Sequence, residues 1–187
     1  NIAGTISGGN ALLLAQGNIN NQSLTSTFTS NNDQVSQTLV TGVSSITATN
    51  NLALSASDNI IDVGGQISAQ GNLSLTAGND IALKSLATSH TNTATYSQSN
   101  STTQVVSQLK GGNLSLVAGN DLLAQGSALQ SDGSLALQAG NNLTLTAVQD
   151  TQSQSSNTSN ARQSSNSSTA NTVSLAANNN ISLLAGV

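Results

Sequence analysis

The stretch that decides the fold runs from Asn72 to Leu83 and reads NLSLTAGNDIAL. Its aliphatic residues alternate with polar ones, first from Leu73 to Ala77 and again from Ile81 to Leu83. A period of two is typical of a β-strand with one buried face. The break between the two runs, Ala-Gly-Asn-Asp, contains residues that tolerate positive φ, which favours a sharp corner. The stretch therefore predicts a strand, a corner and a second strand.

The same pattern recurs along the whole chain. Close copies begin at Asn113 and Ser134, and weaker ones begin at Ala11, Asn51 and Thr172. The step from the copy at 51 to that at 72 equals the step from 113 to 134, whereas the steps from 72 to 113 and from 134 to 172 are about twice as long. Two clean units therefore alternate with one polar segment of similar length. Repeats at such a fixed spacing indicate a solenoid.

A single unit cannot bury its own inward side chains, but stacked units can, at a spacing of about 4.8 Å. We therefore predict an all-β fold, a right-handed parallel β-helix with coils of about 20 residues. Leu73 should stack on Leu52, and Leu135 on Leu114. Roughly nine coils would fit, in a rod about 40 Å long. One set of corner residues predicts a ladder of side-chain amides between coils: Asn79, Asn120 and Asn141.

Three polar segments interrupt the repeats, at about 20–43, 86–111 and 150–171, within a single β-helix segment that spans 1–187. In the first two, Thr-rich alternating runs flank the tetrapeptides 30–33 and 98–101, a pattern that predicts β-hairpin arms. A solvated linker is the alternative. The third, almost purely Ser, Asn, Gln and Thr, predicts a looser version. Because the arms recur once per pair of coils, they should leave the same side of the rod.

Two aromatic residues, Phe28 and Tyr96, stand alone in the first and second polar segments. One interpretation is a plug that closes the arm against the rod. The other is a contact with a partner or a membrane interface, because aromatic residues anchor binding surfaces.

The composition excludes several classes of function. Only Lys84, Lys110 and Arg162 are cationic, so the chain has no basic patch for nucleic acid or anionic lipid. It has no Cys, hence no disulfide or thiolate metal site. No apolar run reaches the roughly 20 residues of a transmembrane helix. With no signal peptide at Asn1, we expect an excised piece of a longer protein.

The titratable residues give no catalytic pattern. All seven acidic residues are Asp, and Asp58, Asp80 and Asp121 fall at or beside the repeated corner, where turn residues bond to the local backbone. Asp58 and Asp62 are the one conceivable carboxylate pair, and His90 is the only His. Gly64-Gly65 and Gly111-Gly112 lack the Asp of calcium-binding repeats. We expect no catalytic residue, no cofactor and no metal site. The remaining acidic residues are Asp33, Asp132 and Asp150.

The repeated Asn-Leu-Ser-Leu-x-Ala-Gly-Asn-Asp motif, in 20-residue units with Ser/Thr/Asn-rich spacers, resembles the haemagglutinin repeats of filamentous-haemagglutinin-like exoproteins. The resemblance covers essentially the whole chain. The arrangement of paired coils and a polar spacer is most like the repeats of contact-dependent growth inhibition effectors. It implies a right-handed β-helix, export by the outer-membrane transporter of two-partner secretion, and a secreted or surface location on a Gram-negative bacterium.

The resemblance also sets the expected function. It implies a structural and delivery segment that contacts the envelope of a target cell and supports transfer of a C-terminal toxin. An adhesin segment that binds a host glycan or protein is the alternative. A polysaccharide-cleaving β-helix is disfavoured, because that chemistry needs clustered carboxylates. We expect the chain to be no enzyme and the isolated segment to be monomeric.

Overall fold

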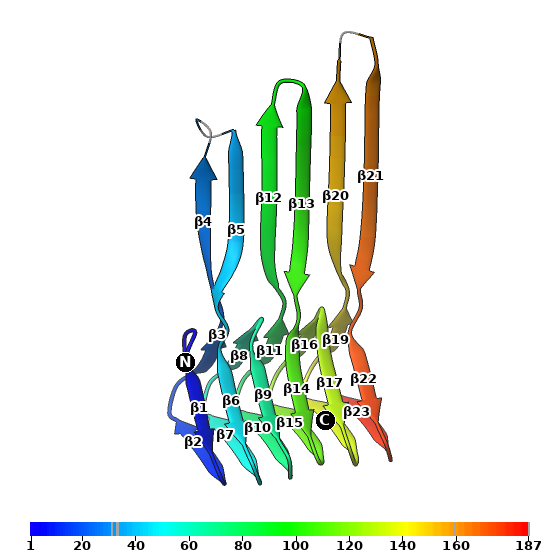
Figure 1. Ribbon diagram of the computed structural model, residues 1–187. Helices are drawn as coiled ribbons and strands as arrows, with labels where there is room; N and C mark the ends of the chain where they lie inside the picture. The colour runs from blue at the N-terminus through cyan, green and yellow to red at the C-terminus, as the bar shows by residue number, and fades with distance from the viewer. Residues whose placement is uncertain (31, 33, 159, 187) are drawn as a thin grey trace.

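The computed structural model describes residues 1–30, 32, 34–158 and 160–186. In these residues the chain forms a right-handed parallel β-helix of six stacked coils, with an antiparallel sheet rising from one side of the rod (Figure 1). The predicted fold class is confirmed. The chain turns through three parallel sheets in each coil, and the polar segments leave the rod at one corner.

The first sheet of the rod contains β1 (Thr5–Gly8), β6 (Ser45–Ala48), β9 (Gln66–Ala69), β14 (Ser107–Gly111), β17 (Ser127–Ser131) and β22 (Ser174–Ala177). The second contains β2 (Ala11–Ala15), β7 (Leu52–Ala56), β10 (Leu73–Ala77), β15 (Leu114–Ala118), β18 (Leu135–Ala139) and β23 (Ile181–Ala185). The third contains β3 (Ile19–Gln22), β8 (Ile60–Val63), β11 (Ile81–Lys84), β16 (Leu122–Gln125) and β19 (Leu143–Thr146).

The core is a narrow column of aliphatic side chains that stack like on like. Leu73 pairs with Leu52 on one side and Leu114 on the other, and Leu114 pairs with Leu135. Leu73 and Leu135 are each only 1% exposed, as the alternation predicted. Each such leucine contributes about 2 kcal/mol on burial, so the rod is held by the number of coils stacked.

Two sequence-based expectations about the rod are wrong. Each coil has three strands, not two, because the short first-sheet strands carry only one large inward aliphatic, such as Ile46, Ile67 or Leu129. The rod has six coils, not nine, because the polar segments do not wrap around it. Six coils at about 4.8 Å each give a rod of roughly 29 Å.

The antiparallel sheet, called the hairpin sheet below, is built from three hairpins. They are β4 (Leu24–Ser30) with β5 (Val35–Gly42), β12 (Leu86–Ala94) with β13 (Ser97–Val105), and β20 (Val148–Asn157) with β21 (Arg162–Asn171). All three leave the same side of the rod, as predicted (Figure 1). They also pair with one another, in the order β21-β20-β13-β12-β5-β4, a pairing that the sequence does not predict.

Details of the arms differ from expectation. The linker alternative is wrong, since all three segments form hairpins. The turn of the second hairpin falls at residues 95–96, before the predicted tetrapeptide, and Gln98 to Ser101 lie within β13. The third segment, expected to be looser, has the longest strands of the three. Residues 20–22 and 107–111 belong to coil strands β3 and β14, not to the arms.

The corner between the third and first sheets decides whether a hairpin leaves the rod. After the second and fourth coils this corner is closed by Gly64 and Gly126, which have φ values of 58° and 49°. Such values suit glycine, because a Cβ would strain the backbone. After the first, third and fifth coils the same corner opens into a hairpin. A short glycine closure and a complete hairpin therefore alternate at one corner.

Candidate interaction surfaces

The hairpin sheet has one strand for each coil of the rod. β4 leaves the first coil and β5 enters the second, β12 leaves the third and β13 enters the fourth, and β20 and β21 do the same for the fifth and sixth. Neighbouring strands of any sheet lie about 4.8 Å apart, which is also the rise of one coil. Each hairpin has two strands and two coils separate successive hairpins, so every strand of the hairpin sheet lies level with one coil. This match explains why the hairpins can pair edge to edge.

One face of the hairpin sheet carries an unbroken line of hydroxyl side chains, called the hydroxyl row below. The strand registers place one Ser or Thr from each strand side by side. Thr27 and Thr38 are hydrogen bonded through their hydroxyls at 2.8 Å. The next line on this face toward the hairpin tips contains only Ser, Thr and Asn. The hydroxyl row consists of Thr27, Thr38, Ser89, Thr102, Thr151 and Ser168.

The opposite face of the hairpin sheet contains Phe28 and His90, both in one cross-strand line with Gln37 between them. Phe28 is 56% exposed. Tyr96 lies in the turn between β12 and β13, remote from the rod, and is 72% exposed. The plug interpretation is therefore wrong for both aromatic residues. The structure places them apart, Phe28 on an edge strand and Tyr96 at a hairpin tip, and both are accessible to a partner.

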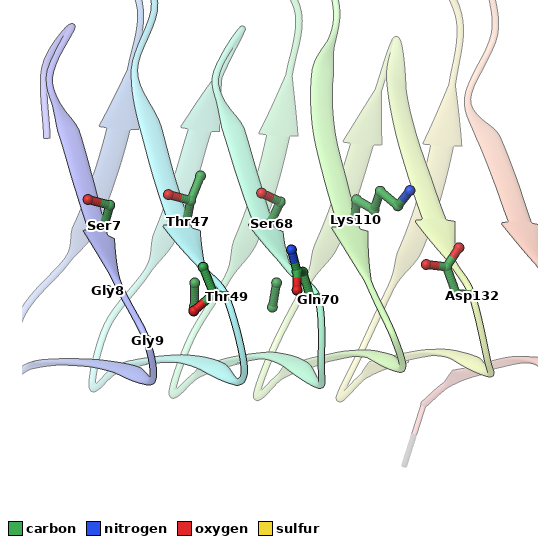
Figure 2. Close-up of a pocket in the computed structure, with 11 residues that line it drawn as sticks. Ser7, Gly8, Gly9, Thr47, Thr49, Ser68, Gln70, Lys110 and Asp132 are labelled. Atoms are coloured by element: carbon green, nitrogen blue, oxygen red, sulfur yellow. The ribbon is translucent and has the colours of Figure 1, made fainter.

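A shallow groove of about 620 Å³ follows the outer face of the first sheet. Figure 2 shows its polar side chains on successive strands, with Lys110 and Asp132 at the end nearer the C-terminus. Ser7, Thr47 and Ser68 occupy equivalent positions in neighbouring coils, followed by Lys110. The groove therefore presents hydrogen-bonding groups spaced by about 4.8 Å along the rod axis.

The corner between the second and third sheets carries a side-chain ladder. Asn59 accepts the backbone N–H of Asp80 at 3.0 Å, Asp80 accepts that of Asp121 at 3.1 Å, and Asp121 accepts that of Asn142 at 3.1 Å. The aspartates thus bond to the next coil, not to the local backbone as expected. A second ladder, at the corner between the first and second sheets, uses Asn10, Asn51, Asn72 and Asn113.

The residues singled out for the predicted ladder lie one position earlier in the corner. Asn79 and Asn120 donate side-chain hydrogen bonds of 2.9 Å to Asn59 and Asp80, and Asn141 donates to Asn120. They act mainly as donors, and the next residue in each coil supplies the repeated acceptor. The recurrence of Asn or Asp at that next position in each repeat was the available signal.

The corner glycines serve close packing and not positive φ. Gly78, Gly119 and Gly140 do not have the left-handed φ that the sequence suggested. A Cβ at Gly119 would instead overlap the carbonyl oxygen of Gly78, and one at Gly140 would overlap that of Gly119. Glycine is required here because the coils approach each other through backbone atoms.

A buried polar cluster lies inside the rod near its N-terminal end, where the first hairpins leave. Asp62 is 0% exposed; Asn21 donates to its Oδ1 at 2.5 Å and the Ser107 hydroxyl donates to its Oδ2. Burial raises the pKa of the Asp62 carboxyl, and the hydrogen bonds from Ser107, Asn21 and the Gly65 backbone offset part of that rise. Gly65 is needed here, because a Cβ would overlap Asn21 and Asp62.

The raised pKa of Asp62 predicts that this carboxyl makes the protein more stable at low pH, the reverse of the usual effect of an aspartate. The folded state holds its proton more tightly than the unfolded state does, so the free energy of unfolding should rise as the pH falls from neutral toward 3.8, the unperturbed value. We expect Asp62→Asn to stabilise the protein at pH 7 and to flatten this dependence, as urea unfolding at several pH values would measure. Asp132→Asn, at an exposed position, is the control. Equal pH profiles for wild type and Asp62→Asn would contradict this reading.

The structure separates the remaining titratable candidates. Asp62 faces the interior whereas Asp58 is exposed at a corner, so the conceivable carboxylate pair does not share a surface. Asp150 accepts the backbone N–H of Gln104 at 2.7 Å. Among the described residues, no group of three or more His, Cys, Asp or Glu could hold a metal ion. Asp33 lies outside the described residues.

These features define the class of protein: a solenoid of β-coils that displays surfaces along its length. In the described part of the chain, no helix is long and apolar enough to span a membrane.

The family model of the hemagglutinin repeat matches residues 41–101 and 89–167. The matches cover more than half of the chain, which therefore belongs to the hemagglutinin repeat family. No curated protein and no solved structure matches. Proteins of this family are structural or adhesive and are typically secreted or displayed at the cell surface.

Proposed function

We propose that this chain is a stiff, surface-displayed segment of a two-partner-secretion exoprotein of a Gram-negative bacterium, and that its hairpin sheet contacts the envelope of a target cell. The observation that carries the proposal is the pairing of the three hairpins into one sheet on one side of the rod. A sheet concentrates its side chains on two broad faces, whereas separate arms would not.

The composition of the hairpin sheet supports a contact role and not a core role. Its strands contain mostly hydroxyl and amide residues, and Phe28 and Tyr96 are accessible anchors. β4, β20 and β21 are largely exposed, β5 and β12 are mostly half-buried, and β13 is mixed. Such groups exchange hydrogen bonds with water for hydrogen bonds with a polar partner at little net cost. The rod supplies length and stiffness, and the sheet supplies the surface that meets the partner.

The finer proposal is delivery of a toxin, as in contact-dependent growth inhibition effectors. In this proposal the parent protein is exported by the outer-membrane transporter of two-partner secretion, and the segment supports transfer of a C-terminal toxin. No catalytic step is assigned to it. Asp62 is buried inside the rod, and Asp80 and Asp121 accept hydrogen bonds in the corner ladder. We therefore assign these carboxylates structural roles.

The test removes the hairpins and keeps the rod. In the fourth coil the corner reads Gln125-Gly126-Ser127, and Ser107 pairs with Ser127, so replacing residues 85–106 by one glycine copies this closure. The same reasoning replaces 23–43 and 147–172. In the parent exoprotein carrying all three replacements, we expect normal surface display but at least a tenfold loss of target-cell killing. A deletion of 86–111 is less suitable, because it would remove β14.

The outcome of this test is unambiguous if display is measured by surface immunofluorescence beside killing. A control exoprotein carries Phe28→Ser and Tyr96→Ser, which keep the hairpins and remove only the aromatic anchors. Killing and attachment that stay at wild-type level in the hairpin-free protein would overturn the proposed role of the hairpin sheet.

A second function is favoured by the groove of Figure 2: adhesion to an extended glycan lying along the rod. Its regular hydroxyl and amide groups suit a polymer of hydroxyl-rich units, and Lys110 suits an acidic one. We expect Lys110→Glu to weaken retention on an immobilised acidic polysaccharide at least fivefold. Lys84→Glu, an exposed lysine on the third sheet, should leave it unchanged. Equal retention of both variants would remove this candidate.

A further inference from the structure

The tips of the second and third hairpins bring three side chains together across the hairpin sheet. Asn157 and Arg162 are cross-strand partners in β20 and β21. The backbone N–H of Asn157 donates to the carbonyl oxygen of Tyr96 at 3.0 Å, one position beyond the last pair of β13 and β20, Ser97 with Ser156. Tyr96, Asn157 and Arg162 therefore follow one another across the two tips, in what is called the tip line below.

The tip line borders a shallow pocket of about 510 Å³, whose wall is completed by residues from the turn of the third hairpin. Hydrogen bonds brace that wall: the backbone N–H of Thr158 donates to the Ala161 carbonyl at 2.9 Å, and the backbone N–H of Ala161 donates to the Thr158 hydroxyl at 3.2 Å. Below the tips, the second and third hairpins pair along their facing strands (Figure 1). The pocket is thus built on hydrogen-bonded backbone.

Arg162 brings a positive charge to this pocket, and no acidic side chain among the described residues pairs with it. Its Nε donates to the side-chain oxygen of Asn157 at 3.2 Å, the one hydrogen bond of its guanidinium within the described chain. Asp150, the acidic residue of these two hairpins, lies seven residues before Asn157 in β20, roughly 24 Å away. That separation exceeds the Debye length of about 8 Å at physiological ionic strength. The terminal nitrogens of Arg162 are therefore available to bind an anion.

The other groups at the pocket suit a sugar. Tyr96, at 72% exposure, offers the face of an aromatic ring, on which the C–H face of a pyranose can stack. The next line toward the rod on the face of Asn157 and Arg162 contains Gln98, Ser155 and Ser164, all exposed. Their amide and hydroxyl groups lie about 6.8 Å below the tip line and can exchange hydrogen bonds with sugar hydroxyls.

We propose that the tip line is a binding site for an anionic sugar: Arg162 pairs with a carboxylate or phosphate on the sugar, and Tyr96 stacks on its apolar face. The inference rests on the proposed contact between the hairpin sheet and an envelope, and it names the chemical group contacted. A guanidinium binds carboxylate and phosphate alike, through two parallel hydrogen bonds. A further strand beside β21 would leave the site open, because side chains of a sheet point above and below it and not toward the next strand.

Nuclear magnetic resonance titration of the chain tests the site directly, because Arg162 is its only Arg and Tyr96 its only Tyr. The Nε–H signal of Arg162 and the ring signals of Tyr96 are therefore each unique. The probes are methyl glucuronide, a glucose phosphate, the neutral methyl glucoside and inorganic phosphate. We expect an anionic sugar to shift both signals with one dissociation constant, at least tenfold lower than that of the neutral glucoside. The two anionic sugars distinguish a carboxylate ligand from a phosphate ligand.

Substitutions separate the two contributions, since each leaves the signal of the other residue in place. Arg162→Gln should weaken binding of the anionic sugar at least tenfold, as measured on the Tyr96 ring. Tyr96→Leu should weaken it at least fivefold, as measured on the Arg162 Nε–H. Lys84→Gln and Phe28→Leu are the matched controls, because they change an exposed cation and an exposed aromatic residue outside the tip line. Both controls should bind like the wild type.

Two results would overturn the site. If neither anionic sugar binds more tightly than inorganic phosphate, the tip line does not recognise a sugar. If Lys84→Gln weakens binding as much as Arg162→Gln, the attraction comes from overall charge and not from the tip line.

Failure of the site is distinguishable from failure of the proposed function. If no sugar binds but the hairpin-free exoprotein loses killing, the contact role of the hairpin sheet stands and the tip line is not its binding site. If the sugar binds through Arg162 but the hairpin-free exoprotein still kills at wild-type level, the site stands and the contact role is wrong.

Discussion

Deleting residues 113–133 should force one hairpin out of the hairpin sheet while the rod stays folded. The deletion removes one repeat and joins Gly112 to Ser134, which takes the place of Asn113 in the corner geometry of successive coils. β18 then stacks on β10, leucine on leucine. After the deletion, β13 enters and β20 leaves the same coil. Both strands would therefore have to occupy the one strand position, about 4.8 Å wide, that this coil provides in the hairpin sheet. One of the two hairpins must lose its neighbours.

Hydrogen exchange of the backbone amides, measured by mass spectrometry, shows which hairpin has lost its neighbours. In the wild type, we expect protected amides in 86–105 and 148–171, and in the deletion variant we expect one segment to lose protection by at least a hundredfold. The matched control carries the same deletion with residues 147–172 replaced by one glycine. It has the same shortened rod and no competing hairpin, so protection of 86–105 should return. Full protection of both hairpins in the deletion variant would mean that the coil and strand spacings are not coupled.

Replacing Gly119 by valine should strongly destabilise the rod. The new Cβ would overlap the carbonyl oxygen of Gly78, a backbone atom that cannot move without breaking the ladder between the third and fourth coils. Overpacking costs about 1–3 kcal/mol, and we expect the upper end of this range here because the overlapped atom belongs to the backbone. Urea unfolding followed by far-UV circular dichroism measures the loss.

Gly9→Val is the matched control for this substitution. Gly9 lies in the corner of the first coil, has no atom within 4 Å of its Cβ position, and has no positive φ. The change at Gly9 should stay within about 0.5 kcal/mol. If both valines destabilised equally, the cost would come from the intrinsic backbone preference of glycine and not from the approach of neighbouring coils.

The sequence predicted the parts of the fold that repeat. Leu73, Leu75 and Ile81 recur with a fixed spacing, and their stacking follows from alternation and from the need to bury one face. The first-sheet strands were missed because each has one large inward aliphatic, such as Ile67, too little for a period to stand out. A search at the period of the leucine repeats would have found Ile46 with Ile67 and, one position off that period, Leu109 with Leu129.

The candidate surfaces were harder to predict. Ser/Thr-rich alternation predicted hairpins, but pairing between hairpins depends on the match of coil rise and strand spacing, which appears only once the number of coils between hairpins is known. The hydroxyl row needs the register of six strands, and no local pattern supplies it. Asp62 was considered only as one of a conceivable carboxylate pair with Asp58. Its place opposite Asn21 and Leu83 in the third sheet shows that it points inward.

The distance between spin labels at Thr27→Cys and Ser168→Cys, measured by double electron–electron resonance, tests the central claim that the three hairpins form one sheet. Labelled protein diluted with an excess of unlabelled protein removes contributions between molecules. The predicted result is a single narrow distribution centred at roughly 24 Å, which corresponds to five strand spacings. A broad distribution that extends beyond about 40 Å would mean that the hairpins move as separate arms, and the account would be wrong.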